Sequence, residues 1–90
     1  MKQLTPKEKI EILIKAKERI ASGASYYMCC AISAVTEREI VSNNVEEYIP
    51  ELFKYKPPIE KRFGPCWFAT DNKKTRIEVL DNTIKDIKNK

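Results

Sequence analysis

The sequence predicts a mainly α-helical, compact domain of three to four helices, with an irregular loop over 57–70 that has room for a short strand. Apolar residues recur at helical spacing near both ends of the chain, and a capping-box pattern precedes the first of these runs. The composition is 42% hydrophobic and 33% charged with only two glycines, which is typical of a folded domain and not of a disordered chain. Ninety residues correspond to a single domain, 1–90.

The first helix is expected to begin after Thr5 and to end at Gly23. Thr5 and Glu8 have the spacing of a capping box, and Pro6 between them suits the first helical position, where no N–H is needed. Gly23 favours the left-handed conformation that ends many helices. Five apolar residues at three- and four-residue spacing are assigned to its buried face: Ile10, Leu13, Ile14, Ile20 and Ala21.

The second helix is predicted over Tyr26–Val35, with Ser25 as its N-cap. This run is apolar on nearly every side, which indicates a central, buried helix. A β-strand is the competing interpretation, but the length, the alanines and the short link to the first helix favour a helix. Cys29 and Cys30 are interpreted as small buried hydrophobic residues of this helix.

Two more capping patterns follow, and a proline interrupts the next helical segment. Thr36-Glu37-Arg38-Glu39 predicts the start of a separate short turn, and Asn44 with Glu47 predicts a second cap. Pro50 either kinks a helix over 45–55 or begins a shorter helix that runs to Tyr55. We prefer the second alternative.

The chain from 59 to 70 is irregular, and a final helix follows it. A short extended piece is expected at Cys66–Phe68, after Gly64-Pro65. Thr70 or Asp71 is expected to cap the last helix. Its apolar residues again have helical spacing: Ile77, Leu80, Ile84 and Ile87.

Several classes of function are disfavoured by residue types. The chain has no histidine, which removes the imidazole of most acid–base and nucleophilic sites, and it has no glycine-rich phosphate loop. The three cysteines form no C-x-x-C pair, so no zinc site is expected. We therefore expect no enzymatic activity, no cofactor and no metal. No apolar run is long enough to cross a bilayer and no secretory signal is visible, which favours a cytoplasmic protein without membrane contact.

The charge is unevenly distributed along the chain. Segment 37–51 carries five acidic and one basic residue, and segment 52–76 carries seven basic and two acidic residues. One hypothesis is that the acidic 37–51 face, including Glu46 and Glu47, recognises and inhibits a host protein. The alternative, without a binding function, is that these carboxylates form a solvated helix face. Nucleic-acid binding is a third hypothesis, disfavoured because the net charge is only +4.

The segment 61–76 combines aromatic rings, cations and the expected start of the last helix. Arginine side chains there suit a phosphate or carboxylate, and an aromatic ring suits a base. Two tyrosines join this pocket if the second helix packs against the loop. The candidate ligand-binding residues are Tyr26, Tyr27, Arg62, Trp67, Phe68, Asn72, Lys73 and Arg76. The alternative, which the size of the domain favours, is that the aromatics cover the core and the lysines are solvated.

The chain also resembles a group of small phage proteins. The residues concerned are Gly23-x-x-Tyr-Tyr-Met-Cys-Cys-Ala-Ile, the block from Tyr48 to Pro57, Trp67-Phe68, and Arg76-x-x-x-Leu80. They are similar to uncharacterised proteins encoded by phages and prophages of gut bacteria. The resemblance implies an accessory protein in the cytoplasm of an infected or lysogenic host. Phage proteins of this size often counter host defence, and one strategy is a homo-oligomeric sponge that sequesters a nucleotide immune signal without cleaving it.

Overall fold

The computed structural model describes residues 3–41, 44–55 and 73–89. These residues contain helices and no strand: α1 (Pro6–Ser22), α2 (Met28–Val35), α3 (Val45–Tyr48), the 3₁₀ helix η1 (Pro50–Tyr55) and α4 (Lys73–Lys88). The mainly helical prediction is confirmed. The strand expected at Cys66–Phe68 and the cap expected at Thr70 or Asp71 lie outside the described residues. Within the described ranges, each helix is too short or too polar to cross a membrane.

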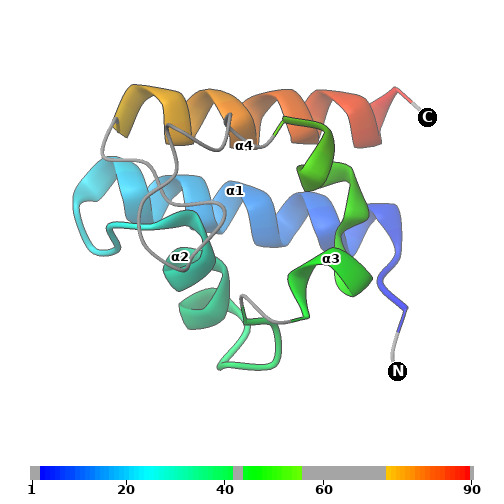
Figure 1. The fold of residues 1–90 in the computed structure, drawn as a ribbon, viewed down its shortest axis with the longest axis horizontal. Helices are drawn as coiled ribbons and strands as arrows, with labels where there is room; N and C mark the ends of the chain where they lie inside the picture. Colours follow the sequence, from blue (N-terminus) through cyan, green and yellow to red (C-terminus); the bar gives the residue numbers. More distant parts are fainter. Residues whose placement is uncertain (1–2, 42–43, 56–72, 90) are drawn as a thin grey trace.

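The two long helices, α1 and α4, run antiparallel along the long axis of the molecule and pack against each other (Figure 1). Helix α2 packs on α1 towards one end, while α3 and η1 lie at the other end, where η1 contacts α4. The core lies between these elements. Its buried apolar residues are Leu13, Ala16, Ile20, Met28, Ala31, Ile32, Ile40, Val45, Ile49, Leu52, Val79, Leu80, Ile84 and Ile87.

Both ends of α1 form as the sequence predicts. The Thr5 hydroxyl accepts from the Glu8 backbone N–H at 3.1 Å, and the Glu8 carboxylate accepts from the Thr5 N–H at 3.0 Å. At the other end, Gly23 adopts a left-handed conformation with φ of 84°. These signals act over a few residues, so the surrounding fold does not need to be known to predict them.

The buried face of α1 differs from the prediction. Leu13, Ala16 and Ile20 are the residues buried by α2 and α4, whereas Ile14 and Ala21 are exposed. Adjacent helical residues point roughly 100° apart, so Leu13 and Ile14 cannot both face the same neighbours squarely. Ala16, three residues after Leu13 and four before Ile20, completes this buried face.

Helix α2 begins two residues later than predicted, at Met28, with Tyr27 at the N-cap position. Ser25 does not cap it; the Ser25 hydroxyl accepts from Arg19 Nε at 2.9 Å, at the end of α1. The prediction that both neighbouring cysteines are buried is also wrong, because Cys30 is exposed and Cys29 is half-buried. This short helix buries one side against α1 and leaves the other side open.

The end of α2 is a Schellman motif without glycine. The Arg38 N–H donates to the Ser33 carbonyl at 2.7 Å, and the Glu37 N–H donates to the Ala34 carbonyl at 3.4 Å. Glu37 and Arg38 have φ values of 54° and 68°. The left-handed region is costly for residues with a Cβ, so this turn stores strain.

The capping box predicted at Thr36 is therefore wrong. Thr36 is the C-cap of α2, and its hydroxyl donates to the Ile32 carbonyl at 2.8 Å. The same hydroxyl accepts from the Ile40 N–H at 3.1 Å, four residues on. The predicted short turn does begin at Thr36, since the Glu39 N–H donates to the Thr36 carbonyl at 3.1 Å, and the threonine also joins it to the end of α2.

Replacing Glu37 by glycine should raise the free energy of unfolding by about 0.5–1 kcal/mol. Glycine removes the Cβ penalty of the left-handed conformation but adds entropy to the unfolded chain, so the net gain is smaller than the penalty. Urea denaturation followed by circular dichroism measures the difference. Glu39→Gly is the matched control, since Glu39 is exposed and is not left-handed. If Glu37→Gly destabilises as much as Glu39→Gly, the strain assigned to this turn is wrong.

Asn44 occupies the N-cap position of α3 but makes no capping bond with its side chain. Its Oδ1 accepts from the Val41 N–H at 2.7 Å, and its Nδ2 donates to the Glu39 carbonyl at 3.0 Å. The capping box expected between Asn44 and Glu47 is thus absent, because the preceding turn uses the amide. The preferred alternative for Pro50 is confirmed, since η1 begins there and runs to Tyr55.

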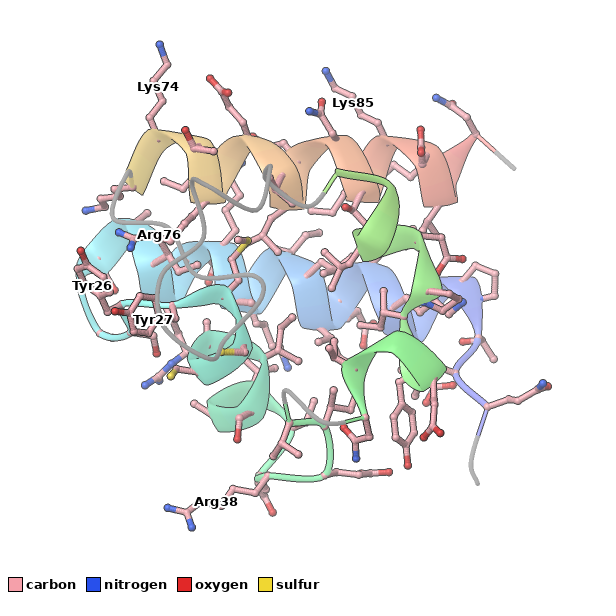
Figure 2. All side chains as sticks on the ribbon, in the orientation of Figure 1. Tyr26, Tyr27, Arg38, Lys74, Arg76 and Lys85 are labelled. Carbon is pink, nitrogen blue, oxygen red and sulfur yellow. The ribbon has the colours of Figure 1, made fainter. Side chains whose placement is uncertain are left out.

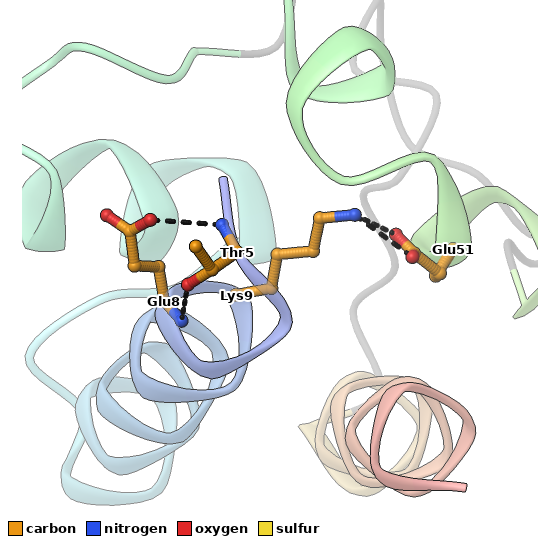
Figure 3. A network of polar contacts seen from close by, with 4 residues as sticks. All are labelled: Thr5, Glu8, Lys9 and Glu51. Carbon is orange, nitrogen blue, oxygen red and sulfur yellow. Dashed lines mark hydrogen bonds and ion pairs between the residues drawn. The ribbon is translucent and has the colours of Figure 1, made fainter. Parts of the chain in front are cut away.

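Among the described residues, two ion pairs connect α1 to its neighbours. Lys9 Nζ contacts both carboxylate oxygens of Glu51, at 3.1 and 3.0 Å, and so joins α1 to η1 (Figure 3). Lys17 Nζ lies 2.7 Å from Asp81 Oδ1 and joins α1 to α4. The first pair is largely shielded, with 15% and 10% of the two side chains exposed. The second is open to solvent, with 39% and 40% exposed.

Candidate functional site

Three of the predicted ligand-binding residues gather at one end of the molecule, where the turn from α1 to α2 meets the first turn of α4 (Figure 2). Arg76 Cζ lies 4.2 Å from the centroid of the Tyr26 ring, within the range of a cation–π contact. The Tyr26 and Tyr27 rings meet edge to face, with centroids 4.7 Å apart and planes at 90°. We call these three residues the Tyr26 cluster.

Local structure explains why the two tyrosines reach this position. Gly23 ends α1 in a left-handed conformation, and the Ser25 N–H donates back to the Arg19 carbonyl at 3.2 Å. The chain therefore turns sharply and presents Tyr26 and Tyr27 just before α2 begins. Tyr27 is also the N-cap residue of α2, and its carbonyl accepts from the Ala31 N–H at 2.9 Å.

The position of Arg76 on the apolar face of α4 explains why it is buried. It precedes Leu80 by four residues, so it lies on the helix face that packs against α1. Only 3% of Arg76 is exposed, which makes it a buried cation. A buried charge is costly unless it has favourable neighbours, and the face of Tyr26 is one of them.

Lys73 contributes to the same end of the molecule through the backbone of α1. Its Nζ donates to the carbonyl oxygen of Ala21 at 2.8 Å, across 52 positions of sequence. The last carbonyls of a helix lack partners within the helix and carry partial negative charge, so an ammonium group stabilises them. Lys73 thus ties the start of α4 to the end of α1.

The structure therefore brings together four of the eight predicted site residues: Tyr26, Tyr27, Lys73 and Arg76. The other four, Arg62, Trp67, Phe68 and Asn72, lie outside the described residues. Tyr26 is 52% exposed although the Arg76 guanidinium lies over its ring. The cluster therefore offers an aromatic surface to solution, with a cation behind it.

A second feature escaped the sequence analysis. An open hollow of about 360 Å³ lies along α2, lined by Cys29, Cys30, Ser33, Ala34, Arg38 and Val41. The signal for it is the spacing of the four α2 residues, which places them on one helix face opposite the buried one. Within the described ranges, no three cysteine, aspartate or glutamate residues lie close enough to hold a metal ion.

The described carboxylates of the acidic segment 37–51 lie on different elements, and the side chain of Glu46 lies outside the described residues. Glu37 and Glu39 lie on the turn after α2, and Glu47 lies on α3, all exposed. The Glu51 carboxylate is bound to Lys9. Among the carboxylates that the structure describes in this segment, three are exposed and one joins η1 to α1.

Comparison of the chain with family models, curated proteins and solved structures finds no match.

Proposed function

We propose that the protein is a non-catalytic binding protein that sequesters a small phosphate-bearing ligand of the nucleotide class. The observation that carries this proposal is the Tyr26 cluster, in which an exposed ring is backed by the buried guanidinium of Arg76. Exposed aromatic rings bind nucleobases by stacking, whatever the base. A binder of this kind forms a stoichiometric complex and breaks no bond in its ligand.

Charge at the same end of the molecule supports the phosphate part of the proposal. Lys73 and Lys74 are both exposed at the start of α4, and Lys74 points away from the body of the protein (Figure 2). The Lys73 ammonium lies at the end of α1, just before the turn that carries Tyr26, and a cation there attracts a ligand that carries both a base and a phosphate. Such binding weakens as salt is added.

The resemblance to phage accessory proteins suggests the biological role. A sponge in the cytoplasm of an infected or lysogenic bacterium would remove a nucleotide immune signal by holding it, as a homo-oligomer. This role requires high affinity and no turnover, which suits a chain without histidine.

The test is a panel of cyclic dinucleotides, cyclic mononucleotides and linear nucleotides, measured by thermal shift and by titration calorimetry. We expect at least one to raise the melting temperature and to be recovered intact after the protein is denatured. Tyr26→Ala should reduce the shift, and Lys85→Ala, which removes an exposed cation towards the other end of α4, should leave it unchanged.

An empty panel would refute the proposal. In that case a host protein that the wild-type chain binds, and that Glu47→Lys releases, would support the alternative of an interaction module acting through the acidic 37–51 segment. Affinity for DNA or RNA that falls steeply with salt would instead support nucleic-acid binding.

A further inference from the structure

We infer that Arg76 is a positioning residue: it holds the Tyr26 ring as the surface on which the ligand's base stacks, and it does not contact the ligand's phosphate. This inference rests on the proposed function and assigns the recognition within that site. In this assignment, Tyr26 binds the base of the ligand and other groups bind its phosphate.

Burial separates the two roles. Bidentate binding of a phosphate needs oxygen atoms about 2.7–2.9 Å from the guanidinium nitrogens. Arg76 is 3% exposed, so its guanidinium offers almost no surface that a dissolved anion can reach. Tyr26, in contact with it, is 52% exposed and is reached first by any ligand.

Two neighbours fix the orientation of the Tyr26 ring. The Arg76 guanidinium lies over it at 4.2 Å, and the Tyr27 ring meets it at 90°. An exposed side chain normally loses rotamer freedom when a ligand binds, and this loss weakens affinity. A ring that is already held in place avoids much of that loss, so removing Arg76 should weaken stacking even though Arg76 does not contact the ligand.

We assign the phosphate to the exposed cations at the start of α4, first of all Lys73, whose Nζ lies at the end of α1. These cations attract phosphate as point charges, and salt screens them. Stacking on Tyr26 is largely insensitive to salt. The two contributions are therefore separable by comparing a nucleotide with its nucleoside.

The experiment measures the equilibrium affinity of the 90-residue chain for adenosine monophosphate and adenosine, and for guanosine monophosphate and guanosine. Tyr26→Ala should weaken the monophosphate and the nucleoside alike, by about 5- to 100-fold. Arg76→Met, which keeps the length of the side chain without its charge, should weaken both by one common factor. Arg76→Lys should recover part of that loss, because a lysine ammonium also binds a ring face.

Each outcome decides the inference. If Arg76→Met weakens the monophosphate and spares the nucleoside, Arg76 binds phosphate and the inference is wrong, while the proposed function stands. A nucleoside without measurable affinity, or Tyr26→Ala without effect on a wild-type protein that binds, also overturns it. If the wild-type protein binds none of these four ligands but binds a cyclic nucleotide of the panel, the inference fails and the proposed function stands; if it binds no ligand of the panel, both fail. Tyr26 is exposed, so Tyr26→Ala still tests the inference if Arg76→Met does not fold.

Discussion

Leu13→Ala is expected to lower the free energy of unfolding by about 2–5 kcal/mol, the range for truncating a fully buried leucine. Leu13 is completely buried on the α1 face against which α2 and α4 pack. The Leu13→Ala substitution removes most of the apolar surface of this side chain. It leaves a cavity that the surrounding helices fill only in part. Urea denaturation followed by circular dichroism gives the difference, provided that unfolding is two-state.

The matched control is the next residue along the chain. Ile14 has an aliphatic side chain of the same size but is 39% exposed, so Ile14→Ala should cost less than about 1 kcal/mol. The two residues differ in burial and not in composition. Equal losses from the two variants would contradict the orientation of α1 described here.

This pair also shows what apolar spacing predicts and what it does not. Spacing of three and four residues located α1, and it assigned both Leu13 and Ile14 to the buried face. Which of them is buried depends on where α2 and α4 approach the helix. That is a property of contacts distant in sequence, and a single helix carries no information about it.

For the ends of helices, too, local sequence predicts some features, and contacts distant in sequence decide others. The start of α1 was predictable because Thr5 and Glu8 bond to each other's backbone, three residues apart. The start of α2 was not, because Ser25, a good N-cap by residue type, binds the Arg19 side chain instead. Its end also carries no glycine to indicate a Schellman motif.

For the candidate site, residue types identified the members and the fold determined their roles. Tyr26 and Arg76 were chosen as an aromatic ring and a cation, but their contact joins residues far apart in the chain. The burial of Arg76 had a signal, because it lies four residues before Leu80 on the apolar face of α4. No signal in the sequence predicts the hydrogen bond from Lys73 to the Ala21 carbonyl, since any exposed lysine has the same local pattern.

Lys9→Met is expected to lower the free energy of unfolding by about 1.5–3 kcal/mol. The substitution keeps the length of the side chain but leaves the shielded Glu51 carboxylate without the ammonium that bonds both of its oxygens. Removing one partner of a shielded charged pair costs more than the pair contributes, because the remaining charge stays poorly solvated. Urea denaturation at neutral pH and moderate salt measures the loss.

Lys17→Met is the control, because its pair with Asp81 joins two helices in the same way but is open to solvent. Water replaces the lost ammonium there, so the cost should be about 0–1 kcal/mol. A double variant, Lys9→Met with Glu51→Met, should recover part of the stability lost in Lys9→Met, since no charge then remains in the shielded position. If the two single variants lose equal stability and the double variant recovers none, the contact between α1 and η1 depends on apolar packing and not on this ion pair.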